Sequence, residues 1–375
     1  MKLIPYTDIR NAIPAIALVA ANVTVMAGPK VQLVAILAVF ALFFRYLEID
    51  RKGVVLIGYV CLILGIGFLT YGGHHAVVKA GKLALFCLAS ALAVRGSGDG
   101  DKSFPALVAL RAFFGLCAAN FLYAAATGNK VFRADHFIEF SIYSSYTIGL
   151  LVYLARPRLT LSDRGLAWVF ALLCGSTTGL VVLILADLIG RKWKPKFVIG
   201  SACVAPFAVF ALHRLMEARG KELSLEFLAN SDRAVLLRTF YDTTLQTFSK
   251  TDWLFGVGVG RPFHEFITPD RGFDGYLYRL GEDGIYSFCL HNEAARILCD
   301  FGLVGLLLVG LRLFANCRLP VLVLLGLCML TNSYLYSFSG ALIASSLFNP
   351  KPARLRSRAR EQREIETPET DRAYA

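Results

Sequence analysis

The chain has 375 residues, of which 56% are hydrophobic and 18% are charged, and its mean hydropathy is +0.57. A soluble domain usually carries about 25% charged residues, so this composition excludes a soluble globular protein and favours one embedded in a lipid bilayer. The net charge of +12 does not indicate nucleic-acid binding, because the basic residues fall mostly in short loops between apolar segments and in the C-terminal tail.

Apolar segments suited to crossing a bilayer recur along the chain. The first of them, 12–28, lacks a small-residue cleavage site followed by a soluble domain, which indicates a membrane span and not a cleaved signal peptide. The segments predicted before a long polar stretch are 12–28, 31–44, 53–70, 76–94, 105–126, 140–155, 166–190 and 197–213. Segments 299–314 and 319–348 follow that stretch.

The positions of Lys and Arg predict which ends of these segments face the cytoplasm. The first six segments alternate correctly if the cytoplasmic sides are those with basic residues at 2–10, 45–52, 95–102 and 156–164. The next basic cluster, 191–196, would fall outside if segment 166–190 crossed once. Two shorter crossings, reversing at the glycines and hydroxyl side chains of 174–179, would keep it inside. The sequence leaves both alternatives open.

Segment 319–348 is also too long for one crossing, and we expect a reversal near Thr331-Asn332-Ser333. The prediction is an all-α polytopic membrane protein with about 12 transmembrane helices and both ends in the cytoplasm. Residues 1–159 form the N-terminal helices, and 160–348 form a second domain. That domain contains one large periplasmic loop, 214–298, which carries short interfacial helices. The charged tail 349–375 is expected to be disordered and cytoplasmic.

The nine cysteines lie mostly inside apolar segments, and no Cys-x-x-Cys pair is present. We therefore expect free thiols that pack as small hydrophobic side chains, and no zinc site. The acidic residues of the long loop lack the spacing of metal ligands, so we expect no metal and no other cofactor.

The long loop begins with a predicted amphipathic helix. Ser231 can cap this helix, whose apolar face would hold Leu237, Tyr241, Leu245 and Phe248. Arg233 and Arg238 lie off that face. They would meet anionic lipid headgroups, a bound phosphate or only solvent, and the sequence does not choose among these.

Glycines alternate in the next part of the loop, Asp-Trp-Leu-Phe-Gly-Val-Gly-Val-Gly-Arg at 252–261. Gly256, Gly258 and Gly260 let the backbone approach a ligand or turn sharply. This is not a dinucleotide-binding fingerprint, because no strand precedes it in a βαβ unit. The aromatic residues that follow, within 273–288, would suit stacking on sugars or an interfacial aromatic belt.

His291 begins the sequence His-Asn-Glu-Ala-Ala-Arg, which leads into span 299–314. A neutral histidine can take a proton from a hydroxyl nucleophile, and Glu293 or Asn292 can orient it. Arg296 would add fixed positive charge on the same helix. A histidine at a membrane surface can also simply hydrogen-bond a loop, and the residues alone do not decide between these interpretations.

The order and spacing of these motifs, ending in Asp-Phe-Gly-Leu-Val-Gly at 300–305, resemble the C-terminal signature of the O-antigen ligase and Wzy-type polymerase superfamily over about 160–348. The resemblance implies a glycosyltransferase of the bacterial inner membrane. Such an enzyme moves an oligosaccharide from undecaprenyl pyrophosphate to an acceptor hydroxyl at the periplasmic face. His291 would then be the general base.

The resemblance also implies arginines that hold the pyrophosphate, and it places Arg238 and Arg261 in that role. The family often has Ser-Arg at the hairpin, where this chain has Ser176-Thr177. That departure removes one expected pyrophosphate ligand, unless Arg133 or Lys130 of the earlier outer loop substitutes for it. Arg296 is a further candidate for binding the same group.

The acceptor remains open. A growing glycan would make the protein a polymerase of O-antigen or exopolysaccharide, which we favour because the loop has no marked docking surface for a bulky glycolipid. A lipid A core would make it a ligase of lipopolysaccharide synthesis. A different class, a polysaccharide transporter or lipid flippase, is favoured only by charges within or near spans at Lys79, Lys82 and Arg111. The expected partners are the lipid-linked oligosaccharide, the glycan acceptor and the bilayer, and no nucleic acid.

Overall fold

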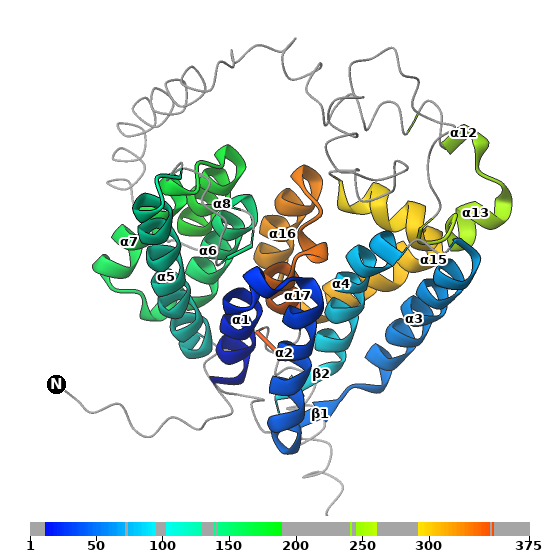
Figure 1. Ribbon diagram of the computed structural model, residues 1–375, viewed down its shortest axis with the longest axis horizontal. Coiled ribbons are helices and arrows are strands. Elements are labelled where there is room, and N and C mark those ends of the chain that lie inside the picture. The colour runs from blue at the N-terminus through cyan, green and yellow to red at the C-terminus, as the bar shows by residue number, and fades with distance from the viewer. Residues whose placement is uncertain are drawn as a thin grey trace, which may run out of the picture.

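A computed structural model describes residues 12–71, 74–94, 103–129, 138–139, 141–189, 241, 245–260, 292–345 and 347–348. Most of these residues are helical (Figure 1). The longer helices are α1 (Ile13–Val23), α2 (Pro29–Leu42), α3 (Arg51–Tyr71), α4 (His74–Ala91), α5 (Ser103–Ala126), α6 (Ser141–Ala155), α7 (Leu161–Leu173), α8 (Thr177–Leu188), α15 (Glu293–Asn316) and α16 (Leu319–Thr331). Shorter ones are α12 (Leu245–Thr247), α13 (Lys250–Phe255), α17 (Phe338–Ala344) and the 3-10 turns η2 (Val25–Ala27), η3 (Phe44–Tyr46), η4 (Arg156–Arg158) and η8 (Tyr334–Tyr336).

The helices follow the predicted apolar segments closely. Three of them are long and apolar enough to cross a membrane: Gly53–Tyr71, Ser103–Ala126 and Glu293–Asn316. Helix α5, with 24 residues, is about 36 Å long, which exceeds the roughly 30 Å of a hydrocarbon core. The helical fold of a membrane protein is therefore as predicted. Segment 197–213 and the tail from 349 lie outside the described residues. Of the helix expected after Ser231, only Tyr241 and the stretch from Leu245 are described, and Leu245–Thr247 form α12.

The reversal predicted within 166–190 is confirmed. Helix α7 ends at Leu173, Gly175 adopts a positive φ of 61°, and the Ser176 side chain accepts a hydrogen bond from Gly179 N at 3.1 Å to begin α8. Arg164, near the start of α7, pairs with Asp187, near the end of α8, at 3.4 Å. The two helices are therefore antiparallel, and the alternative of one continuous helix is wrong.

The second predicted reversal is confirmed as well. Helix α16 ends at Thr331, and the chain returns through η8 and α17, so that the Cys317 thiol before α16 reaches Ala344 O at the end of α17. The returning arm consists of η8 and α17 joined by short irregular stretches, and residues 332–345 are all buried. Irregular backbone at membrane depth is tolerated where protein covers it, because its polar groups then find partners away from lipid.

The bundle has two distinct ends. One end, which we name the basic end, holds every described arginine except Arg111 and Arg296: Arg45, Arg51, Arg156, Arg158, Arg164, Arg312 and Arg318. Contacts across helices define it: the Arg158 side chain reaches Ser103 at the start of α5, and Arg156 binds Ile189 O after α8. At the opposite loop end, α3 terminates at Tyr71 and α15 begins at Glu293.

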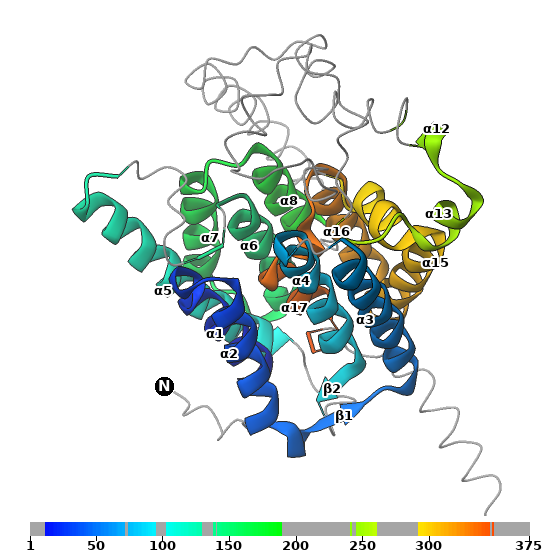
Figure 2. The ribbon, with the colours of Figure 1, turned by 45° about the vertical axis from the view of Figure 1, so that its right-hand side comes forward.

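One feature of the basic end was not predicted. Strands β1 (Leu47–Ile49) and β2 (Leu92–Val94) pair antiparallel, so the described fold is not purely helical. Arg312 of α15 joins this ladder to the bundle, since its guanidinium lies 2.6 Å from Asp50 Oδ2 and also binds Ser90 O. Figures 1 and 2 show the ladder at the end of the molecule away from α13.

Candidate functional site

The structure places some of the predicted site residues and not others. His291, Arg238, Arg261 and Arg133 lie outside the described residues. Asn292, Glu293 and Arg296 are described, as are the three loop glycines Gly256, Gly258 and Gly260. The described ones meet at the loop end, around the first half of α15.

Asn292 begins α15. Its side-chain oxygen accepts a hydrogen bond from Ala295 N at 3.0 Å, which satisfies one of the free amides of the first turn. Its amide nitrogen lies 3.5 Å from Leu330 O, near the end of α16. Asn292 thus fixes both the start of α15 and its position beside α16, and this sets the backbone that immediately follows His291.

Three charged side chains follow on one face of α15. Glu293, Arg296 and Asp300 are spaced by three and four residues, which brings them onto neighbouring turns. All three are buried, and Glu293 is 0% exposed. Glu293 Oε2 accepts a hydrogen bond from Leu335 N at 2.8 Å, whereas its Oε1 has no hydrogen-bond partner. In this position Glu293 anchors the helix to the arm that follows α16 and does not reach the protein surface.

Arg296 is held by an aromatic ring. Its guanidinium carbon lies 3.4 Å from the ring centroid of Tyr336, and its Nε lies 3.9 Å from Asp300 Oδ2, too far for a hydrogen bond. The Tyr336 hydroxyl donates to Asp300 Oδ2 at 3.3 Å. Ring and carboxylate together compensate a charge that is otherwise costly to bury. We name Glu293, Arg296, Asp300 and Tyr336 the α15 cluster.

A further buried carboxylate, Glu139, lies next to the two of the α15 cluster. Glu139, just before α6, accepts hydrogen bonds from Phe338 N at 2.5 Å and Ser339 N at 2.9 Å, at the start of α17. Its own amide donates to the side chain of Asn22 at the end of α1. The Tyr143 hydroxyl interacts electrostatically with Arg296, Glu293 and Glu139, so the two groups form one polar layer across the loop end.

The glycine segment packs against helices. Val257 N donates to Cys299 O at 2.8 Å, and Tyr59 of α3 donates to Phe301 O at 2.6 Å. Helix α15 breaks directly after these carbonyls, at Gly302, which has φ 64° and ψ −169°. A break frees carbonyl oxygens, and here the loop and α3 supply their donors.

Close contact explains the glycines at this break. A Cβ at Gly256, whose φ is 81°, would lie 2.6 Å from the Phe301 amide, and one at Gly302 would overlap Leu254 O. Gly258 and Gly260 also have positive φ angles, of 88° and 92°. Gly256 and Gly302 therefore allow the loop backbone to approach α15 closely.

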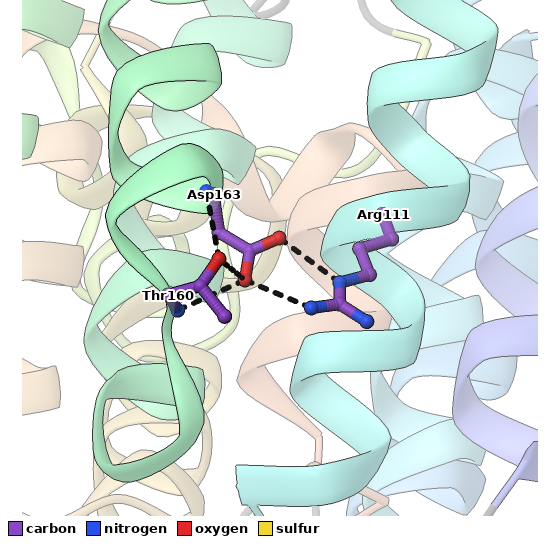
Figure 3. Close-up of polar contacts among 3 residues, drawn as sticks. All are labelled: Arg111, Thr160 and Asp163. Atoms are coloured by element: carbon purple, nitrogen blue, oxygen red, sulfur yellow. Dashed lines mark hydrogen bonds and ion pairs between the residues drawn. The ribbon is translucent and has the colours of Figure 1, made fainter. Parts of the chain in front are cut away.

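Arg111, one of the charges that favoured a transporter, has a carboxylate partner. Figure 3 shows its guanidinium forked onto Asp163, with Nε 2.9 Å from Oδ1 and Nη2 3.0 Å from Oδ2. Thr160 donates to the same carboxylate and accepts from the Asp163 amide, a capping box that starts α7. These hydrogen bonds, that from Arg111 first, lower the pKa of Asp163 from 3.8 to about 2.

The other two charges that favoured a transporter, Lys82 and Lys79, have fewer described contacts. The Lys82 ammonium lies 5.0 Å from the centroid of the Phe338 ring, within the range of a cation–π contact. The side chain of Lys79 lies outside the described residues.

Sequence reasoning missed several members of the polar layer. Asp300 was read only as part of a motif, and Tyr336 and Glu139 were not singled out. The spacing of Arg296 and Asp300 was an available signal, because oppositely charged residues four apart on an apolar helix can pair with each other inside the bundle. The contact with Tyr336 depends on the return of the chain after α16, which no local pattern specifies.

No protein-family model and no curated protein matches this chain. Among the described residues, no three or more His, Cys, Asp and Glu side chains form a group that could hold a metal ion.

Proposed function

We propose that the protein is a glycosyltransferase of the bacterial inner membrane that moves an oligosaccharide from undecaprenyl pyrophosphate to a glycan hydroxyl, as a surface-polysaccharide polymerase. The observation that supports the proposal is the α15 cluster, which lies buried in the bundle immediately after His291 in sequence. Charges inside a membrane bundle mark functional sites by default, because they are costly to bury. The order of motifs around the cluster supports the particular chemistry.

The two ends of the bundle support the orientation that this reaction needs. Arginine is enriched on the cytoplasmic side of membrane proteins, so the basic end is proposed to face the cytoplasm. The loop end, where α15 begins, then faces the periplasm. A topology of about twelve spans is proposed to place loop 214–298 on the same side. A lipid-linked donor on the periplasmic leaflet would meet His291 there.

The proposed step is a single displacement. His291 takes the proton of the acceptor hydroxyl, whose oxygen attacks the anomeric carbon of the donor sugar. The bond from that carbon to the pyrophosphate oxygen breaks, and undecaprenyl pyrophosphate leaves with the bonding electrons. Arg238, Arg261 and Arg133 are proposed to hold the charge of the leaving group through paired N–H donors.

Two described residues have narrower parts in this proposal. Arg296 lies beneath the site, stacked on Tyr336, and supplies a fixed positive charge partly balanced by Asp300. Glu293 is proposed to position the first turn of α15, and so the backbone that carries His291, through its hydrogen bond with Leu335.

A reconstitution experiment tests the proposal. The protein in lipid nanodiscs receives undecaprenyl-pyrophosphate oligosaccharide and a glycan acceptor in the presence of a chelator, and we expect sugar transfer. His291→Ala should abolish transfer while the variant stays folded, and His74→Ala, another histidine expected at the loop end, should keep it. Full activity of His291→Ala would reject the general-base role.

The same assay separates the alternatives. Extension of a glycan acceptor identifies a polymerase, and transfer only to a lipid A core identifies a ligase. Movement of the lipid-linked oligosaccharide between leaflets without any transfer would identify a flippase, for which the buried charges of α15 would line a transport path.

A further inference from the structure

The short helix α13 exposes apolar side chains beside the bundle. Its N-cap Ser249 and its third residue Asp252 form a capping box that faces solvent, and Lys250 is exposed. At its other end Leu254 is 47% exposed and Phe255 is 46% exposed. An apolar pair left uncovered at the end of an otherwise polar turn indicates a non-aqueous neighbour.

The depth of α13 follows from the glycine segment after it. Gly67 lies against the Val259 carbonyl so closely that a Cβ would overlap it, and Gly67 is about 6 Å from the end of α3. Leu254 O meets α15 at Gly302, about 14 Å along that helix from Glu293. The exposed end of α13 is therefore level with the interior of two membrane-spanning helices, below their loop ends.

The outer faces of α3 and α15 at this level are apolar. Leu69 of α3 is 84% exposed, and Leu303 of α15, the residue after the break, is 44% exposed. Helices of this length and composition present such side chains to acyl chains. Figures 1 and 2 both show α13 beside α15 at the edge of the molecule, so Leu254 and Phe255 are exposed next to this helix.

We infer that α13 is a membrane anchor of the loop: Leu254 and Phe255 insert among phospholipid acyl chains beside α3 and α15, while Ser249 and Lys250 remain in water. The occupant of this surface is lipid because the surface is continuous with the lipid-facing sides of both helices. The inference does not depend on the proposed glycosyl transfer. It holds for any activity of the loop.

Tryptophan quenching by brominated lipids tests the inference. The chain has three tryptophans, Trp168, Trp193 and Trp253, and all are replaced by Phe, which keeps an aromatic ring opposite Phe248. Into this background one variant carries Phe255→Trp, and a second carries Leu254→Trp in case the first does not fold. Lys250→Trp on the polar turn of the same helix is the matched control. Each is reconstituted in phosphatidylcholine vesicles with plain or brominated acyl chains.

We expect tryptophan at 255 or 254 to lose most of its emission in brominated lipid and to resist aqueous iodide. The control at 250 should show the reverse. Quenching by iodide and not by bromine at 254 and 255 would overturn the inference, since the helix would then lie in water. Protection from both quenchers would overturn it too, because protein would then cover the surface.

Discussion

The guanidinium of Arg296 stacks on the ring of Tyr336, 3.4 Å from its centroid, although the two residues are separated by the rest of α15 and the whole of α16. The Tyr336 hydroxyl also reaches Asp300, so one side chain serves both charges of the pair. This arrangement makes Tyr336 the residue on which the polar layer depends, and its ring and hydroxyl can be tested separately.

Tyr336→Phe should cost about 1 kcal/mol of stability, because only the hydrogen bond to Asp300 is lost. Tyr336→Leu should cost about 2 kcal/mol more, since the buried guanidinium also loses its ring. Thermal unfolding in detergent, followed by circular dichroism, measures both. Equal effects of the two substitutions would contradict the proposed role of the ring.

Gly302→Ala should be among the most damaging single-methyl additions in the chain, costing more than about 2 kcal/mol. The new Cβ would meet Leu254 O, and the positive φ at 302 is strained for alanine. Gly310→Ala is the matched control on the same helix, because no atom lies near its Cβ position and alanine favours helix. Similar melting temperatures for the two variants would refute the packing at the break.

Acid should weaken the link between α5 and α7. The pKa of Asp163 is lowered in the fold from 3.8 to about 2, so its ion pair with Arg111 contributes stability that is complete above about pH 5. That contribution falls as the pH drops from there toward 2. Asp163→Asn should therefore be less stable than the wild type at neutral pH, with a difference that narrows toward pH 2. A difference that stays constant over this range would contradict the assignment.

Labelling tests the sidedness of the basic end. Because α7 and α8 are antiparallel, residue 189 lies at the same end as Arg156, and the basic cluster 191–196 follows directly. A cysteine at Lys194 should react with a membrane-impermeant maleimide only from the cytoplasm. Labelling from the periplasm would show that the basic end faces outward. The proposed site would then face the cytoplasm and could not meet a donor in the periplasmic leaflet.

The loop arginines should differ from lysines in donor binding. Arg238→Ala and Arg261→Ala are expected to weaken binding of the lipid pyrophosphate more than Arg→Lys does, because lysine keeps a point charge and loses only the paired donors. Equilibrium binding of undecaprenyl pyrophosphate to nanodiscs measures this. Unchanged affinity in both alanine variants would reject their part in the proposal.

Much of the fold could be predicted because the bilayer imposes a simple rule on sequence. The lengths of the apolar segments predicted the helices, and the alternation of basic residues favoured a reversal inside 166–190, where Gly175 and Ser176 lie between α7 and α8. The β1–β2 ladder was missed because two strands of three residues carry no period long enough to detect.

The candidate site could be predicted only in part. Asn292, Glu293 and Arg296 were identified from their position before a span, and they do lie together. Their partners Leu335 and Tyr336 belong to η8, whose place depends on how the chain turns back after Thr331. Such long-range pairing leaves no local pattern in a single sequence.

The break in α15 bears on how the protein is made. A translocon releases helices into lipid in chain order, yet this one carries exposed carbonyls at Cys299 and Phe301 until Val257 and Tyr59 cover them. Tyr59 belongs to α3, and Val257 belongs to the loop synthesised shortly before α15. We therefore expect integration of α15 to depend on docking of the loop that precedes it.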